Sequence, residues 1–88
     1  MKRVVSVYPT KTWKLLIEFT DADYRVYDAK KHLSGKFSPL GELAENIQLF
    51  LTAHVIPDAG TVGWENGADL DPDVLYEMSE SSNQLNVI

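Results

Sequence analysis

Cysteine is absent from the 88-residue chain, so no disulfide can stabilise the fold and no thiolate can serve as a nucleophile or metal ligand. No stretch approaches the roughly 18 apolar residues of a membrane span. The opening MKRVVSVYPTK also lacks the apolar core of a signal peptide. These absences predict a cytoplasmic protein with no membrane contact, expected to come from a bacterium, and we expect no cofactor.

Basic residues are absent after Lys36. All eight lysines and arginines precede that point together with four acidic residues, whereas nine acidic residues follow it. One interpretation is that the basic N-terminal strands pair with the acidic half; the other is that an acidic face remains for a basic partner. Nucleic-acid binding is disfavoured in either case, because the phosphate backbone requires a dense basic patch.

The remaining composition is that of a folded domain. Hydrophobic residues make up 44% of the chain and charged residues 24%, which excludes wholesale disorder. The length predicts one domain, which we place at residues 1–78. The polar stretch 79–88 is expected to form a flexible tail.

Alternating apolar and polar residues predict three strands near the start of the chain. The three runs are RVVSVYP (3–9), TWKLLIEFT (12–20) and YRVYD (24–28). In the second run, Trp13 shares one face with Leu15, Ile17 and Phe19. Short links between the runs predict an antiparallel meander, and AKKHLSGK predicts one helical turn ended by Gly35.

The period changes after Pro39. Apolar residues now recur at helical spacing, which predicts one amphipathic helix from about Gly41 to Thr52. These apolar residues are Leu40, Leu43, Ala44, Ile47 and Leu51. The runs AHVIP and TVGWE then predict a C-terminal hairpin, and a short terminal helix is expected to turn Leu75 and Met78 toward the core. The expected fold class is α+β: an antiparallel sheet, made of the meander and the hairpin, with one amphipathic helix packed on it and a short terminal helix.

The segment TVGWENGADLDPDVLYEM, residues 61–78, is rich in turn and cap signals. Asn66 and Gly67 predict a tight turn, since both residues tolerate positive φ. Asp71 before a proline predicts the start of a helix. These signals leave Asp69 unexplained, and we expect its carboxylate to accept backbone N–H groups in the loop from Gly67 to Asp71.

Within this segment, the run W-x-N-G-A-D-L-x-P-D-x-L-Y from Trp64 to Tyr76 resembles the signature of the bacterial family called domain of unknown function 2442. The likeness covers residues 3–77 and includes RVVSV, LLIEF, YRVYD and FSPL. It implies a small α+β domain without an established activity. Trp64 is expected to fill the core of so small a domain.

The resemblance also has implications for partners. Members of that family are often found beside a small uncharacterised protein family, and the pair looks like a toxin–antitoxin module. Some members carry an added C-terminal helix-turn-helix domain. Because this sequence ends shortly after the signature, we expect it to have no DNA-binding module of its own.

Three functions stay open. The first is a non-catalytic protein-binding module, the antitoxin-like half of a two-gene pair, whose expected partner is another small and basic protein. The second is a stand-alone regulatory or small-molecule-binding domain, and the third is a small enzyme using Asp69. A homodimer also stays open. The candidate binding residues are Trp64, Asn66, Asp69, Asp71, Asp73 and Glu77.

Catalytic and metal sites receive little support. Asp69 with His54, or a serine with a histidine, would act only if the fold brought the two groups together. The acidic residues from Asp69 to Glu80 imitate the spacing of a calcium loop, but Val74 stands where that loop needs glycine. We assign no catalytic residue and no metal site.

An acidic surface is expected instead, because the later acids outnumber the bases left to neutralise them. Its members should be Glu42 and Glu45 on the outer side of the helix, with Glu65, Asp71, Asp73 and Glu77 around the strand-to-helix loop. A field of this sign would steer a basic protein toward the domain.

Overall fold

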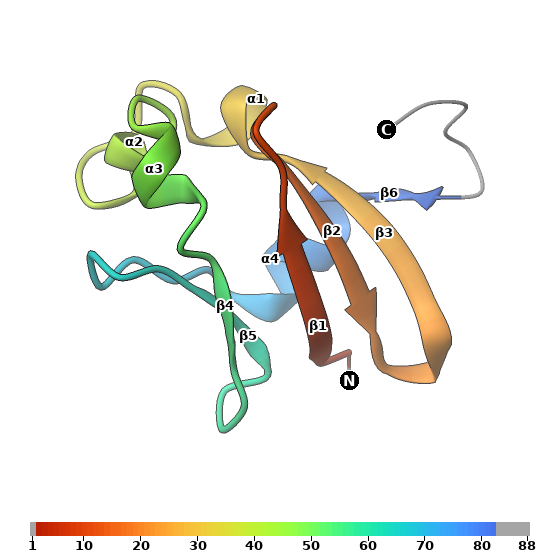
Figure 1. Cartoon of the computed structure of the whole chain (residues 1–88). Coiled ribbons are helices and arrows are strands. Elements are labelled where there is room, and N and C mark those ends of the chain that lie inside the picture. Colours follow the sequence, from red (N-terminus) through yellow and green to blue (C-terminus); the bar gives the residue numbers. More distant parts are fainter. Residues whose placement is uncertain (1, 83–88) are drawn as a thin grey trace.

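The computed structural model describes residues 2–82, which form an α+β fold (Figure 1). One antiparallel sheet has the strand order β1-β2-β3-β6, and a two-stranded hairpin, β4-β5, lies beside β1. The strands are β1 (Val4–Pro9), β2 (Lys14–Phe19), β3 (Asp23–Asp28), β4 (His54–Ile56), β5 (Thr61–Gly63) and β6 (Glu80–Ser81). The helices are α1 (Ala29–Leu33), α2 (Leu40–Leu43), α3 (Ile47–Phe50) and α4 (Pro72–Met78), with a 3₁₀ turn at Thr20–Ala22. The predicted fold class is confirmed.

The meander forms as its alternating pattern predicts. Strand β1 pairs antiparallel with β2, and β2 pairs antiparallel with β3. Along β2, Leu15, Ile17 and Phe19 are buried, whereas the intervening Leu16 and Glu18 are only partly covered. The sheet therefore has an inner face, which carries the first three residues, and an outer face, which carries the other two.

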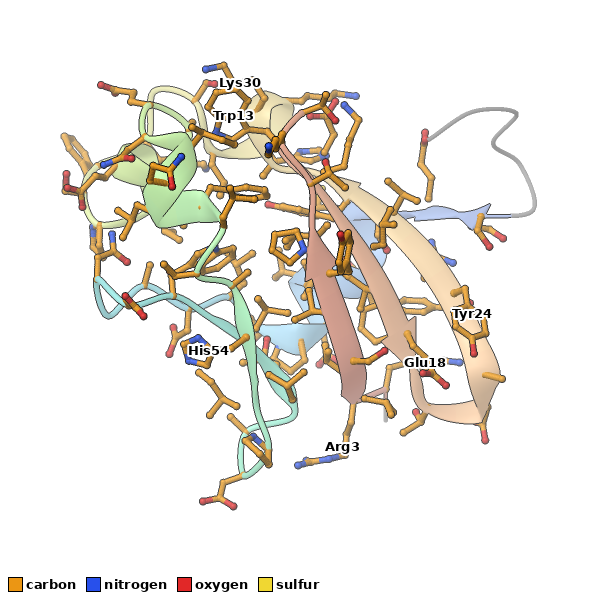
Figure 2. All side chains as sticks on the ribbon, in the orientation of Figure 1. Arg3, Trp13, Glu18, Tyr24, Lys30 and His54 are labelled. Carbon is orange, nitrogen blue, oxygen red and sulfur yellow. The ribbon has the colours of Figure 1, made fainter. Side chains whose placement is uncertain are left out.

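Trp13 departs from the predicted strand. Its φ of 61° is left-handed, so the regular strand begins only at Lys14. The Trp13 indole N–H donates to the Leu43 carbonyl at 2.8 Å, and the Lys30 Nζ lies 4.3 Å from the Trp13 ring centroid (Figure 2). Trp13 thus still packs on the core, but it does so by joining β2 to α2 rather than by extending the strand.

A single core lies against the inner face. Each helix and the hairpin contributes buried side chains to it, among them Leu33 (α1), Leu43 (α2), Phe50 (α3), Val62 (β5) and Leu75 (α4). In Figure 1, α4 lies behind the sheet, while the outer face carries no helix from the described part of the chain. One face of the sheet is packed by the helices. On the other face, Tyr8 and Tyr24 are exposed, whereas Val26 is buried.

The prediction of one helix from Gly41 to Thr52 is wrong. The chain instead forms α2 and α3, separated at Asn46, which is extended at φ −134° and ψ 100°. The Asn46 side chain accepts a hydrogen bond from the Leu49 N–H at 3.2 Å and so begins a new helix. Asparagine competes in this way because its side chain replaces a backbone acceptor at a helix start. The break shifts the helical phase, so Phe50 is buried and Leu51, on the predicted stripe, is only partly buried.

The C-terminal part of the fold differs in two further respects. Leu75 is buried as expected, but Met78 is 48% exposed, so the prediction that it faces the core is wrong. Glu80–Ser81 form β6 and pair with β3, so the ordered fold extends into the stretch expected to be a tail. Residues 83–88 of that stretch lie outside the described residues. Within residues 2–82, no helix is long and apolar enough to cross a membrane.

The helix break yields a stability prediction. Changing Asn46→Ala removes the side chain that caps α3, and we expect the free energy of unfolding to fall by about 1 kcal/mol. Urea denaturation followed by circular dichroism measures this. The control is Gln48→Ala, at an exposed position inside α3, which keeps the cap and should change stability little. Equal stability of the parent and the Asn46 variant would contradict the capping role.

Candidate functional site

Trp64 opens the signature run, and the structure places it in the core with 3% of its surface exposed. Its indole N–H donates to the Phe50 carbonyl at 3.0 Å, and the two rings lie 6.3 Å apart. The Phe50 carbonyl belongs to the last turn of α3, where backbone acceptors lack partners within the helix. Trp64 therefore connects the hairpin to α3, and its predicted burial is confirmed.

Asn66 and Gly67 form the predicted turn. Gly67 has a φ of 87°, and the Asn66 Oδ1 accepts a hydrogen bond from the Ala68 N–H at 3.0 Å. The Asn66 Nδ2 donates to the Pro39 carbonyl at 3.0 Å and to the Glu42 Oε1 at 2.9 Å. Asn66 thus holds the turn and also joins it to the start of α2, an interaction across 27 residues.

Asp71 starts α4 as predicted. Its carboxylate accepts hydrogen bonds from the N–H groups of Asp73 at 2.8 Å and Val74 at 3.3 Å, and Pro72 occupies the first turn. Asp73 adds a negative charge beside the positive end of the helix. These contacts assign a local structural role to Asp71.

Tyr76, the last residue of the signature, fastens α4 to the sheet. Its hydroxyl donates to the Asp23 Oδ2 at 2.7 Å, and the Lys2 Nζ lies 3.2 Å from the same oxygen. The Arg25 guanidinium lies 4.1 Å from the Tyr76 ring centroid and donates to the Ser79 hydroxyl and carbonyl at 2.7 and 2.8 Å. The Tyr76 hydrogen bond, helped by Lys2 and Arg25, outweighs the effect of burial and lowers the pKa of Asp23.

Asp69 does not take the role expected for it. The Ala68 N–H donates to Asn66, and the first N–H groups of α4 donate to Asp71. Among residues 2–82, no backbone N–H donates to the Asp69 carboxylate, which is exposed. The prediction is wrong because other acceptors already bind the donors of the loop: the Asn66 side chain binds the Ala68 N–H, and the carbonyls of Trp64 and Val62 bind the N–H groups of Gly67 and Leu70.

The structure does not join Asp69 to His54, the pair considered for catalysis. The strand register places His54, Gly63 and Asp69 in one row. However, the His54 Nδ1 lies 2.9 Å from the Thr52 carbonyl, and no hydrogen bond joins it to Asp69 in the described part of the chain.

Burial, with a contribution from the neighbouring Asp28 charge, raises the pKa of Tyr27 to about 12. Residues 2–82 contain no group of three histidine, aspartate or glutamate side chains placed to hold a metal ion.

The charged side chains leave the second half of the domain acidic. Within residues 2–82, the ion pairs are Lys2–Asp23 at 3.2 Å and Lys14–Asp28 at 3.6 Å, both inside the N-terminal half. Arg3 does reach the acidic half, but it donates to the backbone carbonyls of residues 57 and 58 (Figure 2). The nine later acidic residues are all exposed and belong to neither ion pair: Glu42, Glu45, Asp58, Glu65, Asp69, Asp71, Asp73, Glu77 and Glu80. An exposed acidic surface is present, as expected.

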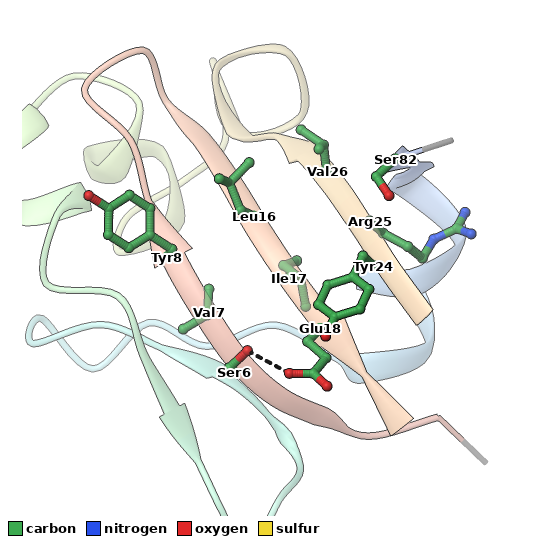
Figure 3. A pocket seen from close by; sticks show the side chains of 10 residues that line it. All are labelled: Ser6, Val7, Tyr8, Leu16, Ile17, Glu18, Tyr24, Arg25, Val26 and Ser82. Atoms are coloured by element: carbon green, nitrogen blue, oxygen red, sulfur yellow. Dashed lines mark hydrogen bonds between the residues drawn. The ribbon is translucent and has the colours of Figure 1, made fainter. Parts of the chain in front are cut away.

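The outer face of the sheet carries an open groove of about 290 Å³ (Figure 3). The register aligns two neighbouring rows of side chains across β1, β2 and β3: Tyr8, Leu16 and Val26, then Ser6, Glu18 and Tyr24. Tyr8 and Tyr24 are 67% and 54% exposed, and the Ser6 hydroxyl donates to the Glu18 Oε1 at 3.2 Å. The groove therefore combines an apolar floor, two exposed aromatic rings and one carboxylate.

The structure divides the candidate binding residues into two groups. Trp64, Asn66 and Asp71 use their polar atoms to hold the fold together. Asp69, Asp73 and Glu77 are exposed and contribute to the acidic surface. The sequence interpretation missed the groove on the outer face. Its signal was the apolar residues on the solvent side of two strands, which is unusual in a half-buried sheet.

Comparison with known proteins identifies one family. The model of the family described as "Protein of unknown function (DUF2442)" matches residues 4–81, almost the whole chain. No curated protein and no solved structure matched this chain.

The turn at Gly67 generates a prediction. Changing Gly67→Val should lower the free energy of unfolding by more than about 1 kcal/mol, because a β-branched residue resists positive φ. Nothing lies within 4 Å of a Cβ added at this position, so the loss would come from the backbone and not from a clash. Thermal unfolding measures it, and Gly67→Asn, which tolerates the same φ, should be milder. Unchanged melting of the valine variant would rule out the turn assignment.

The Tyr76–Asp23 hydrogen bond generates a second prediction. Tyr76→Phe keeps the ring but removes the hydroxyl, so the pKa of Asp23 should rise toward its usual value. A lowered carboxyl pKa stabilises the fold above the unfolded-state pKa, and this stabilisation is lost as pH falls through the folded-state pKa. The variant should therefore lose less stability than the parent on acidification. Carboxyl-carbon NMR titration measures the pKa directly, with Tyr24→Phe on the outer face as the control.

Proposed function

We propose that this chain, which belongs to the DUF2442 family of proteins of unknown function, is a non-catalytic protein-binding module with a basic partner. The observation that carries the proposal is the acidic surface of its second half. Nine exposed carboxylates lie there, and none of them takes part in an ion pair of the described residues. Their field attracts a positively charged protein and repels nucleic acid.

The contacts of the basic side chains support this reading. Arg3 and Lys30 reach across to the acidic half, but both donate to backbone carbonyls. These hydrogen bonds stabilise loops and helix ends, and neither cation forms one of the ion pairs of residues 2–82. The charge asymmetry of the sequence therefore persists on the folded surface and is available to a partner.

The partner in this proposal is the small protein encoded beside the gene, with the present chain as the antitoxin-like member of the pair. A partner that acts on RNA carries a basic groove, because it must bind phosphates. The exposed carboxylates of Glu65, Asp73 and Glu77 would occupy such a groove in place of phosphates. The domain would then act by covering the partner's site and would need no chemistry of its own.

Association rates test the proposal. The rate constant for binding the flanking-gene product should fall at least about tenfold between roughly 10 and 150 mM ionic strength, as the Debye length shrinks from about 30 to about 8 Å. The triple change Glu65→Gln, Asp73→Asn and Glu77→Gln should slow association at low salt and flatten its salt dependence. Stopped-flow fluorescence at the two ionic strengths provides both measurements.

A single-charge comparison serves as the control. Asp21→Asn removes one carboxylate from the N-terminal half, so it should slow association less than Asp73→Asn does. A salt-independent rate, or a triple variant that binds as fast as the parent, would show that the acidic surface is not the steering element. If the flanking product does not bind at all, the two-gene pairing is wrong.

A further inference from the structure

The outer face of β1, β2 and β3 has the side chains of an interface rather than those of a solvated sheet. Leu16 lies between Tyr8 and Val26 in the register, at positions where a water-facing strand normally carries polar residues. Tyrosine is enriched where proteins bind one another, because it offers a large rigid surface and a polar end. Figure 3 shows the rings of Tyr8 and Tyr24 on either side of Leu16 and Ile17.

The uncompensated charges on this face are negative. Arg25 also lines the groove, but its guanidinium bonds to Ser79 and lies over the Tyr76 ring. Lys14 is paired with Asp28, so its charge is compensated. Glu18 lies opposite Tyr24 and accepts a hydrogen bond from the Ser6 hydroxyl, and it takes part in neither ion pair of residues 2–82. Glu80 lies opposite Val26 and is likewise in neither pair. An occupant of this face therefore meets apolar surface together with unpaired carboxylates.

Arginine is the side chain that suits this combination best. Its planar guanidinium can donate two parallel hydrogen bonds to a carboxylate and can also stack on an aromatic ring. Glu18 and Tyr24 are cross-strand neighbours, so they present a carboxylate and a ring side by side. Lysine offers a point charge without the planar surface, and an uncharged side chain would leave Glu18 desolvated without compensation.

A second copy of the chain is a poorer occupant. In a two-fold dimer, the same patch forms both sides of the interface. Within residues 2–82, the cations of the strands that form this face are already engaged, Lys14 with Asp28 and Arg25 with Ser79, so a second copy would bring no free cation from these strands to Glu18. A small molecule is also a poorer occupant, because ligand pockets usually bury about 70–90% of the ligand surface, whereas this groove is open to solvent.

We propose that the outer face of β1, β2 and β3 is the docking surface for the basic partner. An arginine of that partner pairs with Glu18 and stacks on Tyr24, and adjacent apolar side chains rest on Tyr8 and Leu16. This inference depends on the protein-binding function proposed above and adds to it the place of contact and the anchoring residue.

A short peptide probes the face without knowledge of the partner. The probe is acetyl-Leu-Arg-Leu-amide, titrated into the ¹⁵N-labelled full chain. The expected result is a saturable change in the backbone amide signals of β1, β2 and β3 around Leu16, Glu18 and Tyr24. The same peptide with citrulline, which has the shape of arginine but no charge, should bind about fivefold more weakly, in keeping with a partly exposed ion pair.

Two variants and a matched control locate the interaction. Glu18→Gln should weaken binding of the arginine peptide and abolish its advantage over citrulline. Tyr24→Leu keeps an apolar side chain but removes the ring, and it should also weaken binding. Glu45→Gln removes the same charge from an exposed position elsewhere and should leave peptide binding unchanged. Preserved amide spectra confirm that each variant is folded.

The outcomes separate this inference from the proposed function. If the flanking-gene product binds the parent, Glu18→Gln and Tyr24→Leu equally well, the docking face is wrong while the protein-binding function stands. If that product fails to bind but the arginine peptide behaves as expected, the docking face stands and the two-gene pairing fails.

The other occupants are tested in the same samples. Sedimentation velocity reports self-association, and a dimer that Leu16→Arg converts to a monomer would overturn the proposal in favour of a second copy. A chain shortened to end at Ser82 tests the last residues of the protein. If the peptide binds only that shortened chain, the protein's own C-terminal residues occupy the face and the proposal is wrong.

Discussion

The inner face of β2 is the surface on which every other packed element depends. Its three buried side chains, Leu15, Ile17 and Phe19, meet a core to which each helix contributes. Those helices contain only four to seven residues, too few to be stable alone in water. They persist because they bury apolar surface against the sheet and because side chains from elsewhere satisfy the backbone groups at their ends.

Long-range hydrogen bonds from side chains satisfy the backbone carbonyls at the ends of these helices. Trp13 donates to the end of α2, and Trp64 donates to the end of α3. Lys30 donates to the carbonyl of Ala44, just after α2. In a domain of 88 residues without disulfides, such contacts connect segments that local structure leaves separate. They also explain why the signature run is mainly structural: its tryptophan, asparagine and tyrosine each bond to a distant segment.

Predictions from the sequence succeeded where the determining interactions are local. Strand alternation, the turn at Gly67 and the cap at Asp71 each depend on neighbouring residues, and each is confirmed. Prediction failed where a choice between competing partners decides the structure. Asn46 could have continued the helix and instead begins another. The loop donors assigned to Asp69 bond instead to the Asn66 side chain and to backbone carbonyls of the preceding hairpin. The groove could not be predicted because it depends on the register of three strands. That register places Glu18 beside Tyr24 and cannot be read from any one strand alone.

The acidic surface and the outer face have complementary roles in the proposed complex. Charges act over the Debye length, so exposed carboxylates govern the rate of encounter and lose influence as salt rises. The apolar rows around Leu16 act only in contact, so they govern the lifetime of the complex, where most differences in affinity arise. Glu18 belongs to both groups, because it adds to the negative field and lies among apolar neighbours. A carboxylate in that position favours a partner with a matching guanidinium and penalises an apolar partner that would bury it unpaired.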